Sequence, residues 1–93
     1  MIRKYEPIPN DSHKSFYGKC AVYVDDDGAR ALRSYGTIVM SQDAAGGLHR
    51  HWSGWSATTA RHIRAVFPIG TKEYRQMPVE PLPDVWRGIQ YTI

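Results

Sequence analysis

The fold is decided by one stretch of the chain, KCAVYVDDDGARALRSYGTIVMSQ at residues 19–42. From Cys20 to Val24 the side chains alternate between two faces, which is the period of a half-buried strand. Asp25–Gly28 then predicts a turn, because aspartate tolerates left-handed backbone and Asp-Gly is a strong hairpin signal. Residues 30–42 are rich in β-formers and predict a second strand, bent at Gly36.

Downstream of this stretch the pattern predicts a third strand and then a helix. A small-residue turn at 44–47 precedes a short alternating run at 48–52, which we interpret as the third strand. Ser56 is a suitable N-cap for a helix over residues 57–67, and Pro68 ends it.

The helix carries an apolar stripe of Ala60, Ile63 and Phe67 at helical spacing. We expect Ile63 and Phe67 to lie in the core and Arg61 and Arg64 to lie off the stripe. The predicted fold class is therefore α+β, a small antiparallel sheet of three to four strands in the order β-β-β-α with one helix packed on it.

The chain has 93 residues, which predicts a single domain over residues 1–93. Prolines in residues 1–15 indicate an extended N-terminal arm on the surface, and residues 71–93 form a Pro-rich C-terminal segment. The alternation of Ile89, Tyr91 and Ile93 in that segment suggests a fourth strand.

Composition favours a globular protein over disorder, since 42% of residues are hydrophobic and 23% are charged. The apolar runs are too short to cross a bilayer, and the polar start lacks a signal-peptide core. We therefore expect a cytoplasmic protein without a membrane partner. The single cysteine, Cys20, is expected to pack as a small hydrophobic residue.

Positive charge is concentrated in the middle of the chain. The net charge is +3, and residues 29–64 hold five arginines against one aspartate, which gives +4 for this segment alone. Such a region prefers anionic partners.

Three histidines raise the question of a metal site. His49 and His51 are expected to point to one face of a strand, and His62 lies on the following helix. No cysteine or carboxylate spacing completes a coordination set around them. We therefore expect local packing and no metal or other cofactor. Asp25–Asp27 likewise lacks the spaced ligands of a calcium loop.

Catalytic motifs are absent from the sequence. Gly54-Trp55-Ser56-Ala57 lacks the second glycine of a nucleophile elbow, and Ser56 is better explained as a helix cap. The chain also has no Gly-rich phosphate loop and no H-E-x-x-H motif. We therefore expect a binding protein and not an enzyme.

Trp52 and Trp55 flank a Ser-Gly step directly before the helix. Two interpretations stay open for them. They are either core residues of a small domain or part of an exposed contact surface, on which aromatic rings stack on bases while arginines hold phosphates.

Three segments together resemble a known group of proteins: SFYGK at residues 15–19, SYGTIV at 34–39 and SATTARHI at 56–63. The chain resembles small uncharacterised proteins of bacteriophages and prophages over roughly residues 15–67. The resemblance implies a phage-type setting in a bacterial host. Accessory proteins of this kind include anti-CRISPR inhibitors, most of which are acidic, whereas this chain is basic.

Two functions follow as expectations. The first is a non-enzymatic phage-type factor that binds and inhibits or modifies a host nucleic-acid-handling complex, such as a CRISPR defence complex, through an acidic surface of a protein or protein–nucleic-acid complex. The alternative is direct binding of DNA or RNA by an Arg-rich face. The predicted partner-binding residues are Arg33, Arg50, Trp52, Trp55, Arg61 and Arg64.

Overall fold

The computed structural model describes residues 2–5 and 20–90. Within these ranges the chain forms an antiparallel five-stranded sheet in sequential order and three helices. The strands are β1 (Arg3–Tyr5), β2 (Cys20–Val24), β3 (Arg30–Ser34), β4 (Thr37–Gln42) and β5 (Leu48–Arg50). The helices are α1 (Ala57–Val66), α2 (Thr71–Gln76) and α3 (Asp84–Gln90). The predicted α+β class is confirmed, whereas the predicted numbers of strands and helices were too low.

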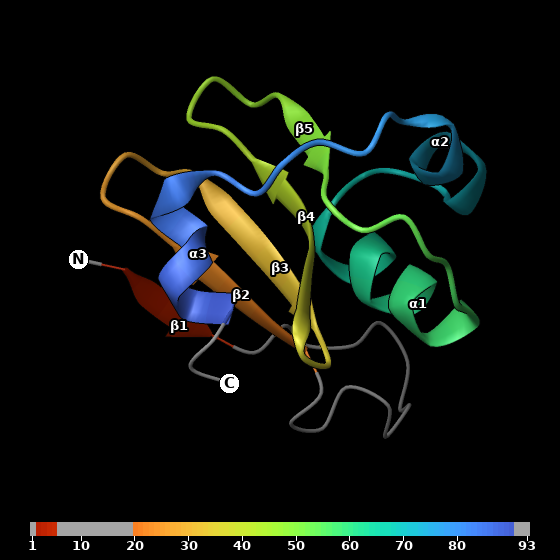
Figure 1. Cartoon of the computed structure of the whole chain (residues 1–93), viewed down its shortest axis with the longest axis horizontal. Coiled ribbons are helices and arrows are strands. Elements are labelled where there is room, and N and C mark those ends of the chain that lie inside the picture. Colours follow the sequence, from red (N-terminus) through yellow and green to blue (C-terminus); the bar gives the residue numbers. More distant parts are fainter. Residues whose placement is uncertain (1, 6–19, 91–93) are drawn as a thin grey trace.

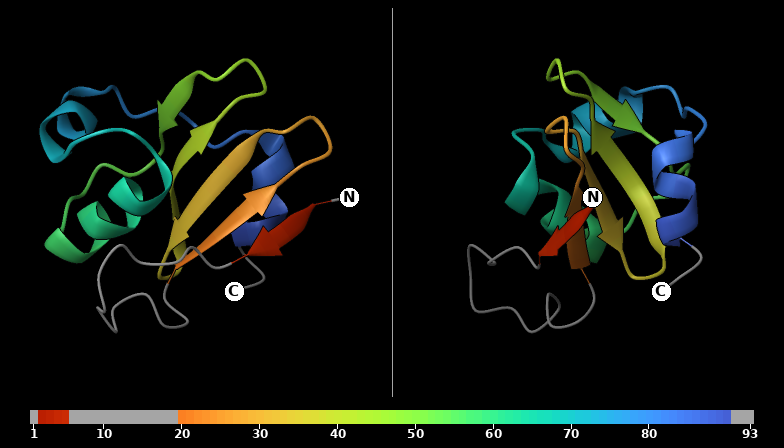
Figure 2. Two further views of the ribbon diagram at one scale, coloured as in Figure 1. Left: turned by 180° about the vertical axis from the view of Figure 1, so that it is seen from behind. Right: turned by 90° about the vertical axis from the view of Figure 1, so that its left-hand side faces the viewer.

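Helices cover both faces of the sheet. Figure 1 and Figure 2 show α1 and α2 on one face and α3 on the other. Cys20 and Val22 of β2 pack under α1 and α2, whereas Ala21 and Tyr23 pack against Trp86 of α3. The prediction of a half-buried strand was therefore wrong for β2, because α3 covers the face that was expected to meet solvent.

The hairpin between β2 and β3 forms as predicted. The Asp25 side chain accepts hydrogen bonds from the backbone N–H groups of Asp27 and Ala29, at 2.9 and 3.0 Å. Gly28 adopts a φ of 89°, the left-handed conformation that glycine reaches without strain. The acidic residues at its tip are exposed to solvent.

The single strand predicted over residues 30–42 is in fact two strands joined by a tight turn. Tyr35 has a φ of 57°, which reverses the chain between Ser34 and Thr37. The β-forming residues in this region correctly predicted extended structure. The chain makes a hairpin at Tyr35 and Gly36, however, where a bend was expected.

Helix α1 matches its prediction closely. The Ser56 hydroxyl accepts a hydrogen bond from the Thr59 N–H at 3.1 Å, so Ser56 is the N-cap. Ile63 and Phe67 are buried, as expected for the apolar stripe. The regular helix ends at Val66, and Phe67 continues in extended backbone.

The two ends of the described chain were predicted less well. Part of the expected N-terminal arm, Arg3–Tyr5, pairs with β2 as the exposed edge strand β1, and the rest of the arm lies outside the described residues. In the Pro-rich segment, α2 begins where the Glu73 carboxylate accepts from the Gly70 N–H at 3.0 Å. The fourth strand suggested by Ile89, Tyr91 and Ile93 is not formed at Ile89, which lies in α3, while residues 91–93 are outside the described ranges. Among the described helices, none combines the length and apolar character needed to span a membrane.

Candidate functional site

A groove of about 240 Å³ lies between the β3–β4 hairpin and the loop that leads into α1. Two tryptophans, a tyrosine and several hydroxyl groups line it: Ser34, Tyr35, Thr37, Val39, Trp52, Trp55, Ser56 and Thr59. Tyr35 and Trp55 are 47% and 45% exposed, whereas Trp52 is half-buried and packs against the core. The structure therefore brings together two predicted site residues, Trp52 and Trp55, and adds Tyr35. We call this feature the aromatic groove.

Tyr35 holds an unusual backbone conformation at this groove. A φ of 57° places it in the left-handed region, which costs a bulky residue on the order of 1–2 kcal/mol. The adjacent Gly36, which could adopt this conformation freely, is not in it. The Tyr35 ring lies with its centroid 5.8 Å from that of His62, tilted by 45°. The turn thus places a large exposed ring beside α1 at a cost in backbone strain.

Arg50 organises the loop that carries both tryptophans. Its guanidinium uses all of its N–H groups on backbone carbonyl oxygens, with donor–acceptor distances between 2.8 and 3.4 Å. The acceptors are the carbonyls of Trp52, Ser53, Gly54, Arg75 and Met77. Arg50 was predicted to bind a partner, but it is only 7% exposed and is committed to these internal bonds.

Tyr74 of α2 completes this network. Its ring lies 4.6 Å from the Arg50 guanidinium carbon, and its hydroxyl donates to the carbonyls of Val39 and Trp52 at 3.0 and 3.2 Å. Burial raises the pKa of Tyr74, while the nearby Arg50 charge opposes that shift. The phenol therefore stays protonated and tethers the tryptophan loop to β4.

Gly54 sets the position of the Trp52 ring. A Cβ at residue 54 would lie 2.5 Å from Trp52 Cζ2 and 2.6 Å from Cε2, closer than real Cβ contacts. The indole therefore lies against the bare backbone of Gly54, and any larger residue would displace it. Glycine is required at this point for the groove to keep its shape.

Hydroxyl groups and a histidine fix the floor of the groove. The Ser34 hydroxyl lies 3.0 Å from Thr59 Oγ1 and 2.7 Å from His62 Nδ1. His62 is fully buried and joins α1 to β3 through this bond, and among the described residues it forms no metal-holding group with the other histidines of the predicted set. Ser56 Oγ accepts from the Thr59 N–H and keeps its own proton for a further acceptor.

Helices α1 and α2 carry several basic side chains, and one of them, Arg75, contacts a residue of the groove. We call Arg61, Arg64, Lys72 and Arg75 the α1–α2 basic surface; with Glu73 they give these helices a net charge of 4 − 1 = +3. Both arginines were expected to lie off the apolar stripe and so to be exposed; Arg64 is exposed, whereas Arg61 is half-buried. The Arg75 guanidinium carbon lies 5.5 Å from the centre of the Trp55 ring, within cation–π range.

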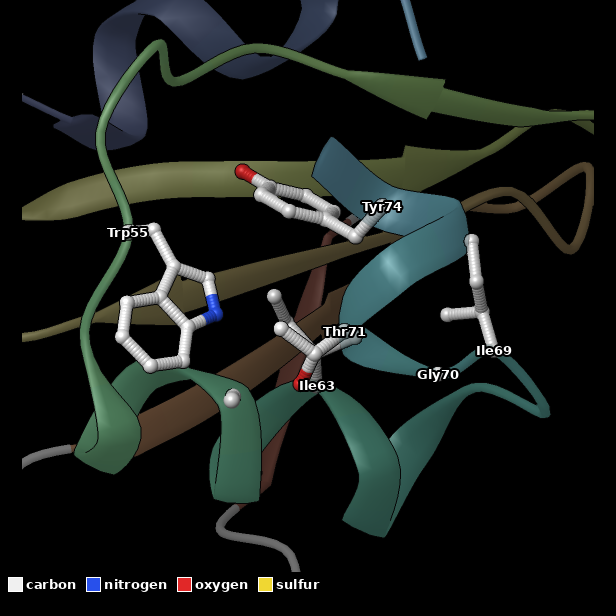
Figure 3. Close-up of a pocket in the computed structure, with 7 residues that line it drawn as sticks. Trp55, Ile63, Ile69, Gly70, Thr71 and Tyr74 are labelled. Atoms are coloured by element: carbon white, nitrogen blue, oxygen red, sulfur yellow. The ribbon is translucent and has the colours of Figure 1, made fainter. Parts of the chain in front are cut away.

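Trp55 also lines a narrow apolar crevice between α1 and α2 (Figure 3). In Figure 3 Trp55 closes one end of the crevice and Ile69 the other, with Ile63 and Tyr74 between them. The crevice leaves no room for a water molecule. Trp55 is therefore anchored on the body of the protein on one side and lines the open groove on the other.

Arg33 does not belong to the exposed basic surface. It is 7% exposed on β3, and its Nε has no hydrogen-bond acceptor among the residues that the structure describes. Of the predicted arginines, Arg61 and Arg64 are thus available to a partner, while Arg33 and Arg50 are buried.

A second hollow, also of about 240 Å³, lies at the opposite end of the sheet near α3. There His49 bridges two carboxylates: Nε2 lies 2.8 Å from Asp43 Oδ2 and Nδ1 lies 3.1 Å from Glu80 Oε2. These hydrogen bonds, Asp43 first, raise the pKa of His49, and the bond from His49 lowers the pKa of Asp43. His49 thus links the 43–47 turn to the segment between α2 and α3.

We expect this bridge to make stability depend on pH. The pKa of His49 is higher in the folded state than its ordinary value of 6.5. Its contribution to stability is therefore fully present at pH values below 6.5 and is lost as pH rises through the higher pKa of the folded state. Asp43 acts oppositely, and its contribution is lost as pH falls through its lowered pKa. Between about pH 6 and pH 9 the parent should therefore lose more melting temperature than the His49→Gln variant. Parallel melting curves for the two proteins over that range would contradict the bridge.

His51 joins two segments through its two ring nitrogens. A carbonyl oxygen only accepts, so His51 Nδ1 carries the proton that bonds the Glu80 carbonyl at 2.9 Å. Nε2 lies 2.7 Å from the Ser41 hydroxyl. Ser41 is only 3% exposed, so this pair ties β4 to the α2–α3 segment and does not present a nucleophile to solvent. Within the described ranges, no group of histidine, cysteine and carboxylate side chains is arranged to hold a metal ion.

Sequence reasoning missed Tyr35, Lys72 and Arg75. Tyr35 was assigned to the middle of a strand, because the following Gly36 predicted only a bend in that strand. Lys72 and Arg75 lie in a part of the sequence whose total charge is neutral, so no local excess pointed to them. Only the packing of α2 against the tryptophan loop brings Arg75 to Trp55.

The site is an exposed aromatic groove on a small α+β framework, with Arg75 of the α1–α2 basic surface beside its Trp55. The chain belongs to a family of unknown function, DUF8033, whose family model matches residues 3–78. The matched region includes the groove and the α1–α2 basic surface and leaves α3 outside. No curated protein and no solved structure matches the chain.

Proposed function

We propose that the chain is a non-enzymatic binding protein that attaches to a nucleic-acid-handling complex of a bacterial host and inhibits or modifies it. The observation that carries the proposal is the exposed Trp55, held beside Arg75 at the edge of the α1–α2 basic surface. Tryptophan, tyrosine and arginine are the residue types that dominate binding energy at interfaces. The resemblance to phage proteins supports a bacterial host as the setting, in which a defence complex of the CRISPR type is a suitable target.

Charge supports an anionic partner. The helices α1 and α2 carry +3, and Arg75 of this set contacts Trp55, which lines the aromatic groove. An acidic protein surface or a protein–nucleic-acid complex would be attracted to this side of the molecule and steered to it. Direct contact with nucleic acid is the second candidate, favoured by aromatic rings and hydroxyl groups in one groove.

The test is a pull-down from bacterial lysate with the parent and the double variant Arg61→Glu/Arg64→Glu. The variant replaces two attractive charges by two repulsive ones, so capture of the partner should fall strongly and depend less on salt. Changes at surface positions away from caps usually alter stability by about 0.5 kcal/mol or less, so a melting curve should show the variant folded.

The matched control is Arg3→Glu/Lys4→Glu on β1, where both side chains are exposed. Each double variant changes the net charge by four units, from +3 to −1. Equal loss of capture in both variants would show that total charge alone matters. A folded Arg61→Glu/Arg64→Glu protein that captures the same partner as strongly as the parent would sink the proposal.

A further inference from the structure

We propose that the aromatic groove holds one unpaired nucleobase of a single-stranded nucleic acid, between the rings of Tyr35 and Trp55. The inference rests on the proposed function, because it names the part of the host complex that this side of the molecule contacts. It is carried by the groove, by the strained turn at Tyr35 and by the charge beside Trp55.

The groove has the size and chemistry for a flat polar ring. Its volume of about 240 Å³ lies below the roughly 300–1,000 Å³ of pockets for drug-sized ligands, so it admits a single ring system. Aromatic rings supply stacking surfaces, and the Ser56 hydroxyl keeps a proton to donate to an acceptor on the edge of a base. An apolar side chain of a protein partner would leave that donor unused.

The strained backbone of Tyr35 indicates that this residue serves binding and not the stability of the fold. The chain places a bulky aromatic residue in left-handed backbone although Gly36 stands next to it. Strain that is kept at an exposed position is typical of binding sites. Here it holds the Tyr35 ring between the groove and His62.

Charge selects nucleic acid over a neutral aromatic ligand. Arg75 lies 5.5 Å from the centre of the Trp55 ring, so a phosphate next to a base stacked on Trp55 is within its reach. Lys72, Arg75 and their neighbours line an open hollow of about 520 Å³ on α2, along which the strand would continue. Stacking on rings with basic groups along the backbone is the usual design of single-strand binding surfaces.

The experiment measures binding of a fluorescently labelled oligothymidylate of about ten nucleotides by anisotropy. Tyr35→Asn is the decisive variant, because asparagine tolerates left-handed backbone but has no ring. We expect about a tenfold or greater loss of affinity, since one stacked base contributes about this much. The melting temperature should stay equal or rise. Tyr35→Phe keeps the ring and should bind like the parent.

Three further arms isolate the groove. Tyr5→Asn removes a second exposed tyrosine, 44% exposed on β1, and should leave binding unchanged. Gly54→Ala displaces the Trp52 ring and should weaken binding without changing any charge. A duplex of the same length should bind more weakly than the single strand, because its bases are already stacked and paired.

The inference is overturned if Tyr35→Asn binds as tightly as the parent, if duplex and single strand bind equally, or if the oligonucleotide does not bind. In each case the proposed function is judged separately by the lysate pull-down. Should nuclease-treated lysate still yield a protein partner whose capture Tyr35→Asn abolishes, the groove takes a protein side chain and the nucleobase assignment fails.

Discussion

Replacing Arg50 by alanine is expected to lower the free energy of unfolding by about 3–5 kcal/mol. The substitution removes the donor to five backbone carbonyls of the tryptophan loop and the α2 end, in part-buried hydrogen bonds. A buried acceptor left without a partner costs about 1–3 kcal/mol, and hydrogen bonds from a charged donor are stronger than neutral ones.

Urea unfolding would measure this loss as a lower midpoint at an unchanged slope. Arg50→Lys should recover only part of it, since a lysine ammonium has three donors and no planar fork. Arg64→Ala is the matched control, because Arg64 is exposed and makes one long bond of 3.4 Å to Thr71. An Arg50→Ala protein as stable as the Arg64→Ala protein would show that the carbonyl network contributes little.

Replacing Phe67 by alanine should cost about 3–5 kcal/mol, the usual range for a buried aromatic residue. Phe67 is 2% exposed and packs with Ile63 in the core under α1 and α2. The guanidinium carbon of Arg30 also lies 5.0 Å from the centre of its ring. The change therefore leaves a cavity and removes a cation–π contact.

Thermal and urea unfolding would both record the loss, and a domain of this size could become largely unfolded. Phe67→Leu is the control, because leucine fills much of the same space and should cost clearly less. Equal stability of the parent and the alanine variant would mean that the α1 end does not pack on the sheet as described.

The parts of the fold that follow from local patterns were predictable. Cys20–Val24 alternates, Asp25–Gly28 makes the turn, and Ser56 caps α1, because each signal lies within a few residues. The third predicted strand ends at Arg50 and not Trp52, and the next carbonyls, those of Trp52 and Ser53, accept from the Arg50 guanidinium.

The remainder depends on contacts between distant segments. Strand β1 exists through pairing with β2, and α3 is stabilised by Trp86 on a face that the sequence pattern alone left open. Short helices such as α2 and α3 carry weak periodic signals, and the prolines around them indicated irregular structure.

The sequence predicted which types of residue form the candidate site, but not which individual tryptophans and arginines belong to it. Trp55 is exposed, as the contact-surface interpretation requires. Trp52 is half-buried, so it lies between a core residue and a surface residue. The sequence could not show that Arg33 and Arg50 are buried while Arg61 and Arg64 are accessible. The partners of Arg50 are backbone carbonyls, which every residue has, so no sequence pattern indicates them. Strain at Tyr35 was likewise visible only in the backbone.

The central claim is that binding takes place at the aromatic groove, and the three tryptophans of the chain allow a direct measurement. Each indole N–H gives its own proton–nitrogen NMR signal. Trp52 and Trp55 line the groove, whereas Trp86 of α3 is buried against the other face of the sheet and serves as an internal reference. On titration with oligothymidylate the Trp52 and Trp55 signals are expected to shift together while the Trp86 signal stays in place. Unshifted Trp52 and Trp55 signals, or a shift largest at Trp86, would contradict the account.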